Sequence, residues 1–258
     1  MTIQEIKDKL VALRLSGMKE ALEEQALNTA YAELTFEERL GMLLEGECLR
    51  RDNNRLRRRL TQARLMEQVG VEDVDTGAER GLERKQVMAL AGGEWIRQKL
   101  NLILLGPTGV GKTHLGCALG REACRLGFTV RYLKMQRLLQ ELILSRADGS
   151  IVKLLHALAR IQVLILDDWL RDPLTPFQAR DILEVLDDRY SRSSTLILSQ
   201  IPVASWHARL GDPTLADALL DRLVHNAYRF ELKGESRRKL QGVKTPHQRI
   251  TKEAGFHD

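Results

Sequence analysis

The residues best suited to chemistry form a glycine-rich stretch, GPTGVGKT, at positions 106–113. Its spacing, G-x-x-x-x-G-K-[ST], is typical of a loop between a strand and a helix that binds phosphate groups. Glycines let backbone N–H groups approach phosphate oxygens without a clash from Cβ, and the N-terminus of the next helix adds partial positive charge. We expect Lys112 to reach the β- and γ-phosphates and Thr113 to ligate Mg²⁺. The full set expected to contact the nucleotide is Gly106, Pro107, Thr108, Gly109, Val110, Gly111, Lys112, Thr113 and His114.

Two acids end an apolar run further along the chain, VLILDDW at 163–169. We expect Asp167, at the end of a buried strand, to hold Mg²⁺ directly or through water, and Asp168 to polarise the attacking water. Adjacent acids at a strand end can also simply begin a turn. Their position downstream of a phosphate-binding loop favours the metal interpretation.

A third apolar run, TLILSQ at 195–200, ends in the polar residues Ser199 and Gln200. Some P-loop ATPases place such a strand between the loop strand and the acidic strand, where its end senses the γ-phosphate. Gln200 is the candidate for this role. An ordinary polar strand end is the alternative.

Two arginines are suited to the charge that develops on a transferring phosphoryl group. Arg222 lies in the amphipathic stretch DALLDRLVHN, and Arg238 lies in KGESRRK. Arg222 would project from one subunit into the site of its neighbour. A surface ion pair with Asp217 or Asp221 is the alternative, and the pattern alone favours it.

The elements that must position these residues alternate between strand and helix. Branched apolar runs occur at 101–105, 129–133, 163–166, 195–198 and 228–232, with helical patterns between most of them. This order predicts a mainly parallel sheet buried on both faces, in a three-layer αβα P-loop ATPase fold.

The chain before residue 70 has a helical pattern. Ile3, Ile6 and Leu10 recur at helical spacing, Gly17 is a possible interruption, and TFEE at 35–38 fits a capping box. Residues 70–81 hold three glycines and little periodicity, which indicates a linker or an entry segment. We therefore expect a small all-helical domain at 1–69 and a P-loop ATPase domain with a short basic tail at 70–258.

Arginines are concentrated between residues 50 and 64, where seven occur with one aspartate, in a chain of net charge +5. Such a cluster is typical of a protein that binds a polyanion, although many charged runs are solvated helix faces. The chain starts without a signal-peptide pattern, holds no membrane-length apolar run, and has three cysteines without metal-type pairing, which together favour buried thiols in the cytoplasm. The arginines expected to bind DNA are Arg50, Arg51, Arg55, Arg57, Arg58, Arg59 and Arg64.

Three segments, LGPTGVGKTHL, LILDDW and GDPTLADALLDRLVHNAYRFELKGES, resemble the IstB family of transposition helper ATPases, which are AAA+ proteins similar to the helicase loader DnaC. The resemblance covers nearly the whole chain. It implies ATP and Mg²⁺ as cofactors, duplex DNA bound with little sequence preference, ATP-dependent homo-oligomers, and delivery of target DNA to the transposase of the same insertion element. It also implies sensor I at or beside Gln200, an arginine finger at Arg222 and sensor II at Arg238.

The sequence departs from the wider AAA+ pattern at two points. Asp168 stands where glutamate is commonest, and its shorter side chain makes slow hydrolysis an expected consequence. The helical lid that usually follows the last strand is not expected in the short, polar stretch after Lys233. Three other functions stay open: a loader of a replicative helicase, a metabolic P-loop kinase, and an ATP-binding scaffold without turnover.

Overall fold

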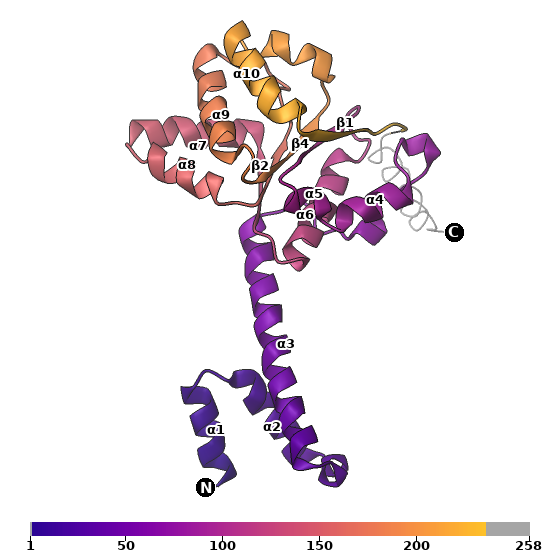
Figure 1. The fold of residues 1–258 in the computed structure, drawn as a ribbon, viewed down its shortest axis with the longest axis vertical. Coiled ribbons are helices and arrows are strands. Elements are labelled where there is room, and N and C mark those ends of the chain that lie inside the picture. Colours follow the sequence, from indigo (N-terminus) through magenta and orange to yellow (C-terminus); the bar gives the residue numbers. More distant parts are fainter. Residues whose placement is uncertain (1, 236–258) are drawn as a thin grey trace, which may run out of the picture. The chain divides into compact units, whose positions relative to one another are not determined.

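The computed structural model describes residues 2–235, and these form two compact units (Figure 1). One unit extends to Thr61 and the other begins at Gln62. The domain boundary predicted between residues 69 and 70 stays a prediction. The division between the two compact units falls earlier in the chain. Arg238 and the stretch in which no lid is expected lie outside the described residues.

The first unit is helical, as predicted. The capping box at Thr35 is confirmed, since Thr35 N–H donates to Glu38 Oε2 (2.8 Å) and Glu38 N–H donates to Thr35 Oγ1 (3.3 Å). These bonds satisfy N–H groups that the first turn of a helix leaves free. The elements are α1 (Ile3–Ala12), α2 (Ser16–Leu27), the 3₁₀ turn η1 (Thr29–Glu33) and α3 (Phe36–Ala63), whose last residues belong to the second unit.

The prediction that Gly17 interrupts a helix is wrong. The break lies between α1 and α2, where Arg14 adopts a positive φ of 59°, and Gly17 lies inside the first turn of α2. A Cβ atom at Gly17 would sit 2.6 Å from the carbonyl oxygen of Gly46 on α3. Glycine is present here because α2 and α3 pack too closely for a side chain.

A buried carboxylate on α3 caps the N-terminus of α2. Glu47 Oε2 accepts hydrogen bonds from the N–H groups of Gly17 (2.7 Å) and Met18 (3.3 Å), and Glu47 Oε1 accepts one from Arg51 Nε (2.7 Å). Burial raises the pKa of Glu47, but the hydrogen bonds from Arg51, Gly17 and Met18 lower it by more, so the net pKa lies below the ordinary value.

This network makes the stability of the first unit sensitive to acid. Since the folded-state pKa of Glu47 is depressed, its stabilising contribution is fully present above the ordinary value of 4.5 and is lost as the pH falls through the folded value. We expect Glu47→Gln to lower the Tm at neutral pH and to flatten its decline in acid, measured by far-UV circular dichroism. Glu45→Gln, at an exposed position of the same helix, is the matched control. A Glu47→Gln protein with the Tm profile of the control would contradict the capping role.

The second unit is built on a five-stranded sheet whose strand pairs are all parallel, in the order β2-β3-β4-β1-β5. The five predicted strands are confirmed to within a residue or two at their ends. The strands are β1 (Asn101–Leu105), β2 (Val130–Lys134), β3 (Val163–Asp167), β4 (Ser194–Ser199) and β5 (Ala227–Glu231). The helices are α4 (Arg84–Ala91), α5 (Glu94–Arg97), α6 (Lys112–Arg125), α7 (Met135–Ala147), α8 (Ile151–Ala159), α9 (Pro176–Arg189) and α10 (Pro213–Val224). Short 3₁₀ turns are η2 (Val71–Asp73), η3 (Ala78–Arg80), η4 (Val203–Ser205) and η5 (His207–Arg209).

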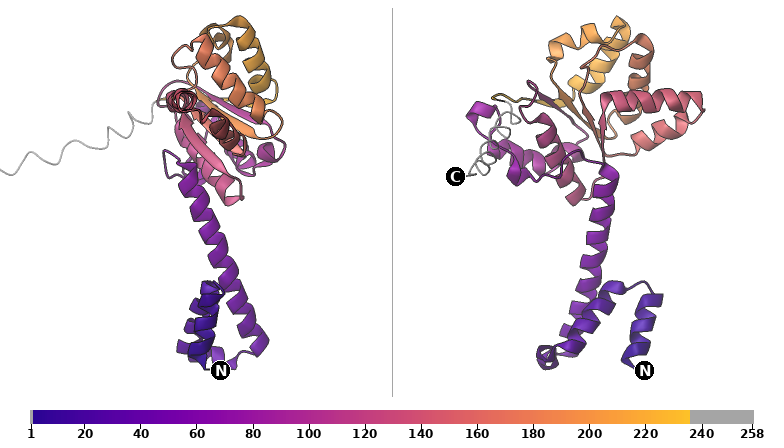
Figure 2. Two further views of the ribbon diagram at one scale, coloured as in Figure 1. Left: turned by 90° about the vertical axis from the view of Figure 1, so that its left-hand side faces the viewer. Right: turned by 180° about the vertical axis from the view of Figure 1, so that it is seen from behind.

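Helices cover both faces of this sheet, with α7 to α10 on one side and α4 to α6 on the other (Figures 1 and 2). Side chains alternate between the two faces along each strand. On β4, Ile197 belongs to the core beneath α7 to α10, whereas its neighbour Leu198 lies where a side chain at Gly116 of α6 would clash. The three-layer αβα arrangement is the predicted one.

Two further expectations can be compared with the described residues. Cys117 and Cys124 are buried on α6, as expected, but Cys48 is exposed on α3, so the expectation of burial is wrong there. Within residues 2–235, no helix is both long and apolar enough to cross a lipid bilayer.

Candidate nucleotide-binding site

The glycine-rich loop joins the end of β1 to the start of α6. Gly106, Gly109 and Gly111 have φ values of 143°, 83° and 109°, which other residues rarely adopt. A Cβ atom at Gly106 would also sit 2.4 Å from the carbonyl oxygen of Leu232. The N–H of Leu232 donates to Leu105 O at 2.8 Å, so the chain leaving β5 holds the start of the loop in place.

Lys112 is buried at the N-terminus of α6 and contacts the loop that precedes it. Its Nζ donates to the carbonyl oxygens of Gly106 (2.7 Å) and Pro107 (2.9 Å). Burial lowers the pKa of Lys112, and the nearby carboxylates of Asp167 and Asp168 oppose that shift. The ammonium group therefore lies inside the loop on two neutral acceptors, which anionic phosphate oxygens would outcompete.

The loop and the acidic strand meet at one carboxylate, that of Asp167. Its Oδ2 accepts hydrogen bonds from Thr113 Oγ1 (2.8 Å) and from the hydroxyl of Tyr132 (2.7 Å), and its Oδ1 accepts one from the N–H of Asp168 (2.7 Å). In the sheet, β4 lies between β1, which leads into the loop, and β3, which ends in Asp167. This is the strand order expected for a γ-phosphate sensor at the end of β4. Thr113 and Asp167, predicted to share a metal ion, are direct neighbours.

This pair of oxygen donors fits Mg²⁺. Magnesium binds through one or two protein oxygens, keeps several waters, and takes its other ligands from nucleotide phosphates. In the described part of the chain, no group of three or more histidine, cysteine or acidic residues could hold a metal by itself. A hydroxyl and a carboxylate beside a phosphate-binding loop are what such a shared site needs.

The second acid has cationic neighbours. Asp168 has a positive φ of 56°, and its Oδ2 lies 3.3 Å from Arg171 Nη1 and 3.8 Å from Lys134 Nζ. Its side chain is half-buried. The predicted role in polarising water stays a prediction, and Asp168 would have to exchange these ion pairs for a water molecule.

The end of β4 connects the loop to the acidic strand. The hydroxyl of Thr108 in the loop donates to Gln200 Oε1, and Ser199 Oγ donates to the carbonyl oxygen of Trp169 (2.9 Å). Trp169 is buried with its ring 5.8 Å from that of Trp206, at an angle of 58°, and its Nε1 has no hydrogen-bond partner within the described residues. Gln200 is thus placed where a γ-phosphate sensor would be, and that role stays a prediction.

The segment predicted to be a linker or an entry segment lines a pocket beside the loop. Residues from η2 to Leu82 lie beside the loop, where Gly77 and Leu82 form an isolated bridge. The sequence did not predict this pocket, because the segment has no periodic pattern of apolar residues. Its apolar residues Val74 and Leu82 were the only signal that it packs against the second unit. A pocket is lined there by Val74, Asp75, Arg80, Leu82, Val110, Gly111, Leu115 and Leu232.

His114, predicted to contact nucleotide, faces the segment that follows α3. Its Nδ1 lies 2.7 Å from Glu67 Oε2, and its Nε2 lies 3.3 Å from the carbonyl oxygen of Asp73. A contact with nucleotide stays a prediction for this residue. The side chain of His114 therefore joins the loop helix α6 to the segment leading to the pocket.

A family model of IstB-like ATP-binding proteins matches residues 8–245. The chain belongs to this family. A putative insertion sequence ATP-binding protein of Sinorhizobium fredii, y4pL, is 48% identical over 92% of this chain and 97% of its own length. Membership confirms the resemblance seen in the sequence and the prediction that ATP is the ligand.

Solved structures share the α/β fold of this IstB-like protein. AMPPCP-bound DnaA from Aquifex aeolicus matches with a TM-score of 0.55 and 20% identity, over 70% of this chain and 55% of that chain. The DnaC helicase loader matches with a TM-score of 0.53 and 18% identity, over 64% of this chain and 96% of that chain. At such identities the likeness concerns the fold alone, and it confirms the predicted class.

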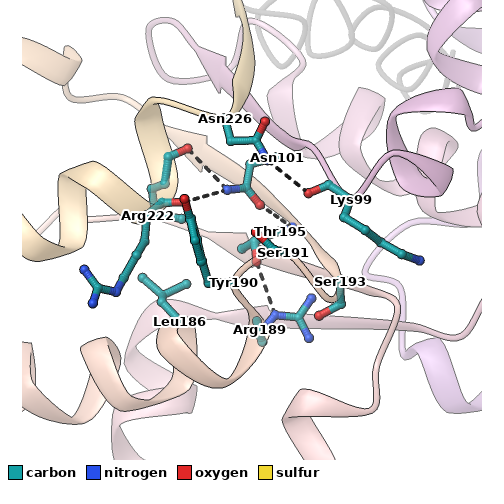
Figure 3. A pocket seen from close by; sticks show the side chains of 11 residues that line it. Lys99, Asn101, Leu186, Arg189, Tyr190, Ser191, Ser193, Thr195, Arg222 and Asn226 are labelled. Carbon is teal, nitrogen blue, oxygen red and sulfur yellow. Dashed lines mark hydrogen bonds between the residues drawn. The ribbon is translucent and has the colours of Figure 1, made fainter.

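Arg222 of the IstB-like chain lies at the other end of the sheet from the loop. Asn101, the first residue of β1, donates from Nδ2 to the carbonyl oxygen of Arg222 (3.0 Å), whereas the loop follows the last residue of β1. One five-residue strand, roughly 16 Å long, therefore separates them. Figure 3 shows the pocket at this edge, with the guanidinium group of Arg222 pointing away from Asn101 and Thr195. The guanidinium group of Arg222 is therefore remote from the loop of its own chain, and its predicted role as an arginine finger stays a prediction.

The ion pair of Arg222 involves a different acid from either of those expected. Arg222 Nε pairs with Asp187 on α9, and Nη1 donates to the carbonyl oxygen of Ala218 (2.9 Å). Asp217 lies 3.3 Å from His207, and Asp221 lies 3.9 Å from His225. The alternative of an ion pair with Asp217 or Asp221 is wrong, because α10 packs against α9 and brings Asp187 within reach instead.

The arginines of α3 in the IstB-like chain differ in their surroundings. Arg57 and Arg58 are exposed and have no ion-pair partner among residues 2–235, so they are available to an external anion. Three others are paired with acids of their own unit. The pairs are Arg50–Glu20 (3.4 Å), Arg51–Glu47 (2.7 Å) and Arg55–Asp52 (3.2 Å).

Arg64 belongs to the second unit of the IstB-like chain. It follows the end of α3 with a positive φ of 49° and is exposed. Burial lowers the pKa of Arg131 on β2, and the positive charge of Arg64 lowers it further. The two guanidinium groups are therefore near enough to repel each other, and a shared anion would relieve that repulsion.

Proposed function

We propose that this IstB-like protein is an ATP-dependent DNA-binding regulator that forms oligomers on duplex target DNA and delivers that DNA to the transposase of the same insertion element. ATP hydrolysis controls assembly and release. The observation that carries the proposal is the position of Arg222, at the sheet edge opposite the loop of its own chain. An arginine placed there suits an ATP site shared between two subunits.

In this proposal, the residues of the loop hold and orient ATP. Lys112 moves from the carbonyl oxygens of Gly106 and Pro107 to the β- and γ-phosphates, and the backbone N–H groups enclose the phosphate oxygens. Thr113 and Asp167 hold Mg²⁺, which neutralises charge on the β- and γ-phosphates when it is bound. Asp168 orients the attacking water, and Gln200, next to Thr108, senses the γ-phosphate.

Hydrolysis then depends on neighbouring subunits. Arg222 leaves Asp187 and stabilises the transition-state charge on the γ-phosphate held by the next subunit. ATP binding thereby favours the assembled state, and hydrolysis favours release, which is a ligand-driven shift of population. Electron microscopy with duplex DNA and a slowly hydrolysed ATP analogue tests this. Ordered oligomers on DNA are the expected result, and a monomer under all conditions would refute the proposal.

In the proposed complex, α3 binds the phosphate backbone of duplex DNA. Contacts of arginine with phosphates carry little sequence information, which suits a protein that accepts many target sites. Arg57 and Arg58 contribute most because they are exposed and lack acidic partners among the described residues. Arg50, Arg51, Arg55, Arg59 and Arg64 would add to the positive field around them.

The DNA proposal makes a quantitative prediction about salt. We expect Arg57→Ala combined with Arg58→Ala to weaken duplex binding on every sequence tested and to reduce the slope of log K against log salt by about 2. The measurement is fluorescence anisotropy of labelled duplexes of unrelated sequence across a salt series. Replacing Arg180 and Arg192, two exposed arginines of the second unit, is the matched control. A loss confined to one sequence, or an unchanged slope, would contradict phosphate contact.

A second candidate is the loading of a replicative helicase, favoured by the fold likeness that covers 96% of the DnaC helicase loader. The two candidates differ in what recruits the protein. The transposition helper binds bare duplex DNA with steep salt dependence, whereas a loader is recruited through the helicase and has no duplex affinity of its own. Titration of duplex DNA with and without helicase separates them.

A further inference from the structure

Tyr132, which neither the motif nor the family description singles out, contacts the carboxylate predicted to hold the metal. It lies on β2 in register with Ile165 of β3, and its side chain is buried. Its hydroxyl donates to Asp167 Oδ2 at 2.7 Å, the same oxygen that accepts a hydrogen bond from Thr113 at 2.8 Å. Two hydroxyl groups, one from the loop helix and one from β2, therefore fix a single carboxylate oxygen.

The hydroxyl of Tyr132 has a second neighbour besides Asp167. Met66 Sδ lies 3.3 Å from the phenolic oxygen. A hydroxyl has one proton, and a carboxylate accepts it far more strongly than a thioether does, so the proton is directed at Asp167. The next residue, Glu67, contacts His114 on the loop helix. The short segment after α3 thus supports both Tyr132 and the residue beside Thr113.

We propose that Tyr132 is a positioning residue for Mg²⁺ binding, which orients the carboxylate of Asp167 toward Thr113. This rests on the proposed function, in which these two residues hold Mg²⁺ with ATP. With Mg²⁺ held by Thr113 and Asp167, the hydroxyl of Tyr132 would still restrain the carboxylate of Asp167, so less rotational freedom would be lost on binding the ion. Neighbours that orient metal ligands in this way typically affect metal affinity by about 10- to 100-fold.

The test is Tyr132→Phe in the full chain, which keeps the ring and removes the hydroxyl. Binding of a fluorescent ATP analogue is measured across a Mg²⁺ series and with the ion removed by EDTA. We expect affinity in EDTA to stay within about twofold of the original chain and the Mg²⁺ concentration for half-maximal enhancement to rise about tenfold. Mn²⁺ binding followed by electron paramagnetic resonance supplies a readout without turnover. Tyr228→Phe, at an exposed position on β5, is the matched control.

A second variant, Tyr132→Met, also lacks the hydroxyl. It must likewise keep its nucleotide affinity in EDTA while needing a higher Mg²⁺ concentration for half-maximal enhancement. Equal losses in both arms would indicate a merely structural role and overturn the proposal, as would Mg²⁺ dependence identical to that of the control. Failure of the proposed function is distinguishable, since in that case the original chain itself would show no Mg²⁺-enhanced nucleotide binding.

Discussion

Replacing Lys112 by alanine is expected to weaken ATP binding by about 100-fold or more. Each hydrogen bond to a charged group contributes about 1.5–3 kcal/mol, and Lys112 is expected to make more than one such bond to the phosphates. The substitution also removes the cation that offsets the triphosphate charge within a buried loop. In the described structure that cation lies inside the loop, where its Nζ donates to two loop carbonyl groups.

The measurement is titration with a fluorescent ATP analogue, supported by the rise in Tm that saturating Mg²⁺–ATP produces. The original chain should gain stability with nucleotide, whereas the Lys112→Ala chain should gain almost none at the same concentration. Lys85→Ala, at an exposed position on α4, is the control for loss of a positive charge. Undiminished affinity in the Lys112→Ala chain would refute the role of the loop.

Replacing Arg222 by alanine is expected to leave ATP binding within about twofold of normal but to reduce turnover in the assembly by about 1,000-fold or more. The reason is geometric, because Arg222 lies at the edge of the sheet opposite its own loop. Loss of nucleotide binding together with unchanged turnover per bound ATP would show that the finger assignment is wrong.

Mixed assemblies make this prediction sharper. A Lys112→Ala subunit lacks a working loop but retains Arg222, and an Arg222→Ala subunit has the reverse defect. When both are inactive alone, mixing them should restore part of the ATPase rate, since some interfaces then combine an intact loop with an intact arginine. Asp187→Asn, which removes the acid that pairs with Arg222, should not abolish turnover, and Asp188→Asn is its control. No recovery in mixtures that do assemble would contradict a shared site.

The parts of the fold that follow from local pattern could be predicted from the sequence. Strands buried on both faces give continuous apolar runs, and the loop motif has a fixed spacing, so β1, β3 and the pairing of Thr113 with Asp167 were all expected. The place of β4 between β1 and β3 also followed, because it is shared by a class of P-loop ATPases.

Contacts set by tertiary packing could not be predicted in this way. Asp187 lies 35 residues before Arg222, and only the packing of α9 against α10 brings them together. Tyr132 looks like an ordinary strand residue until β2 is known to lie beside β3. Gly17 was expected to break a helix, because the sequence does not show that the carbonyl group of Gly46, on another helix, leaves no room for a side chain there.

The indole rings of Trp169 and Trp206, which lie close together at a tilt, give the protein an internal optical probe. Trp169 directly follows Asp168, and its ring lies 5.8 Å from that of Trp206, tilted by 58°. Electronic transitions of two chromophores this close couple, so their near-ultraviolet circular dichroism depends on their mutual orientation. The third tryptophan, Trp95, lies at the opposite end of the sheet, where its carbonyl oxygen accepts a bond from Ser194 at the start of β4. Movement at the end of β3 should therefore change the near-ultraviolet circular dichroism of the unlabelled protein. Trp95, which is remote from that end, serves as the internal reference.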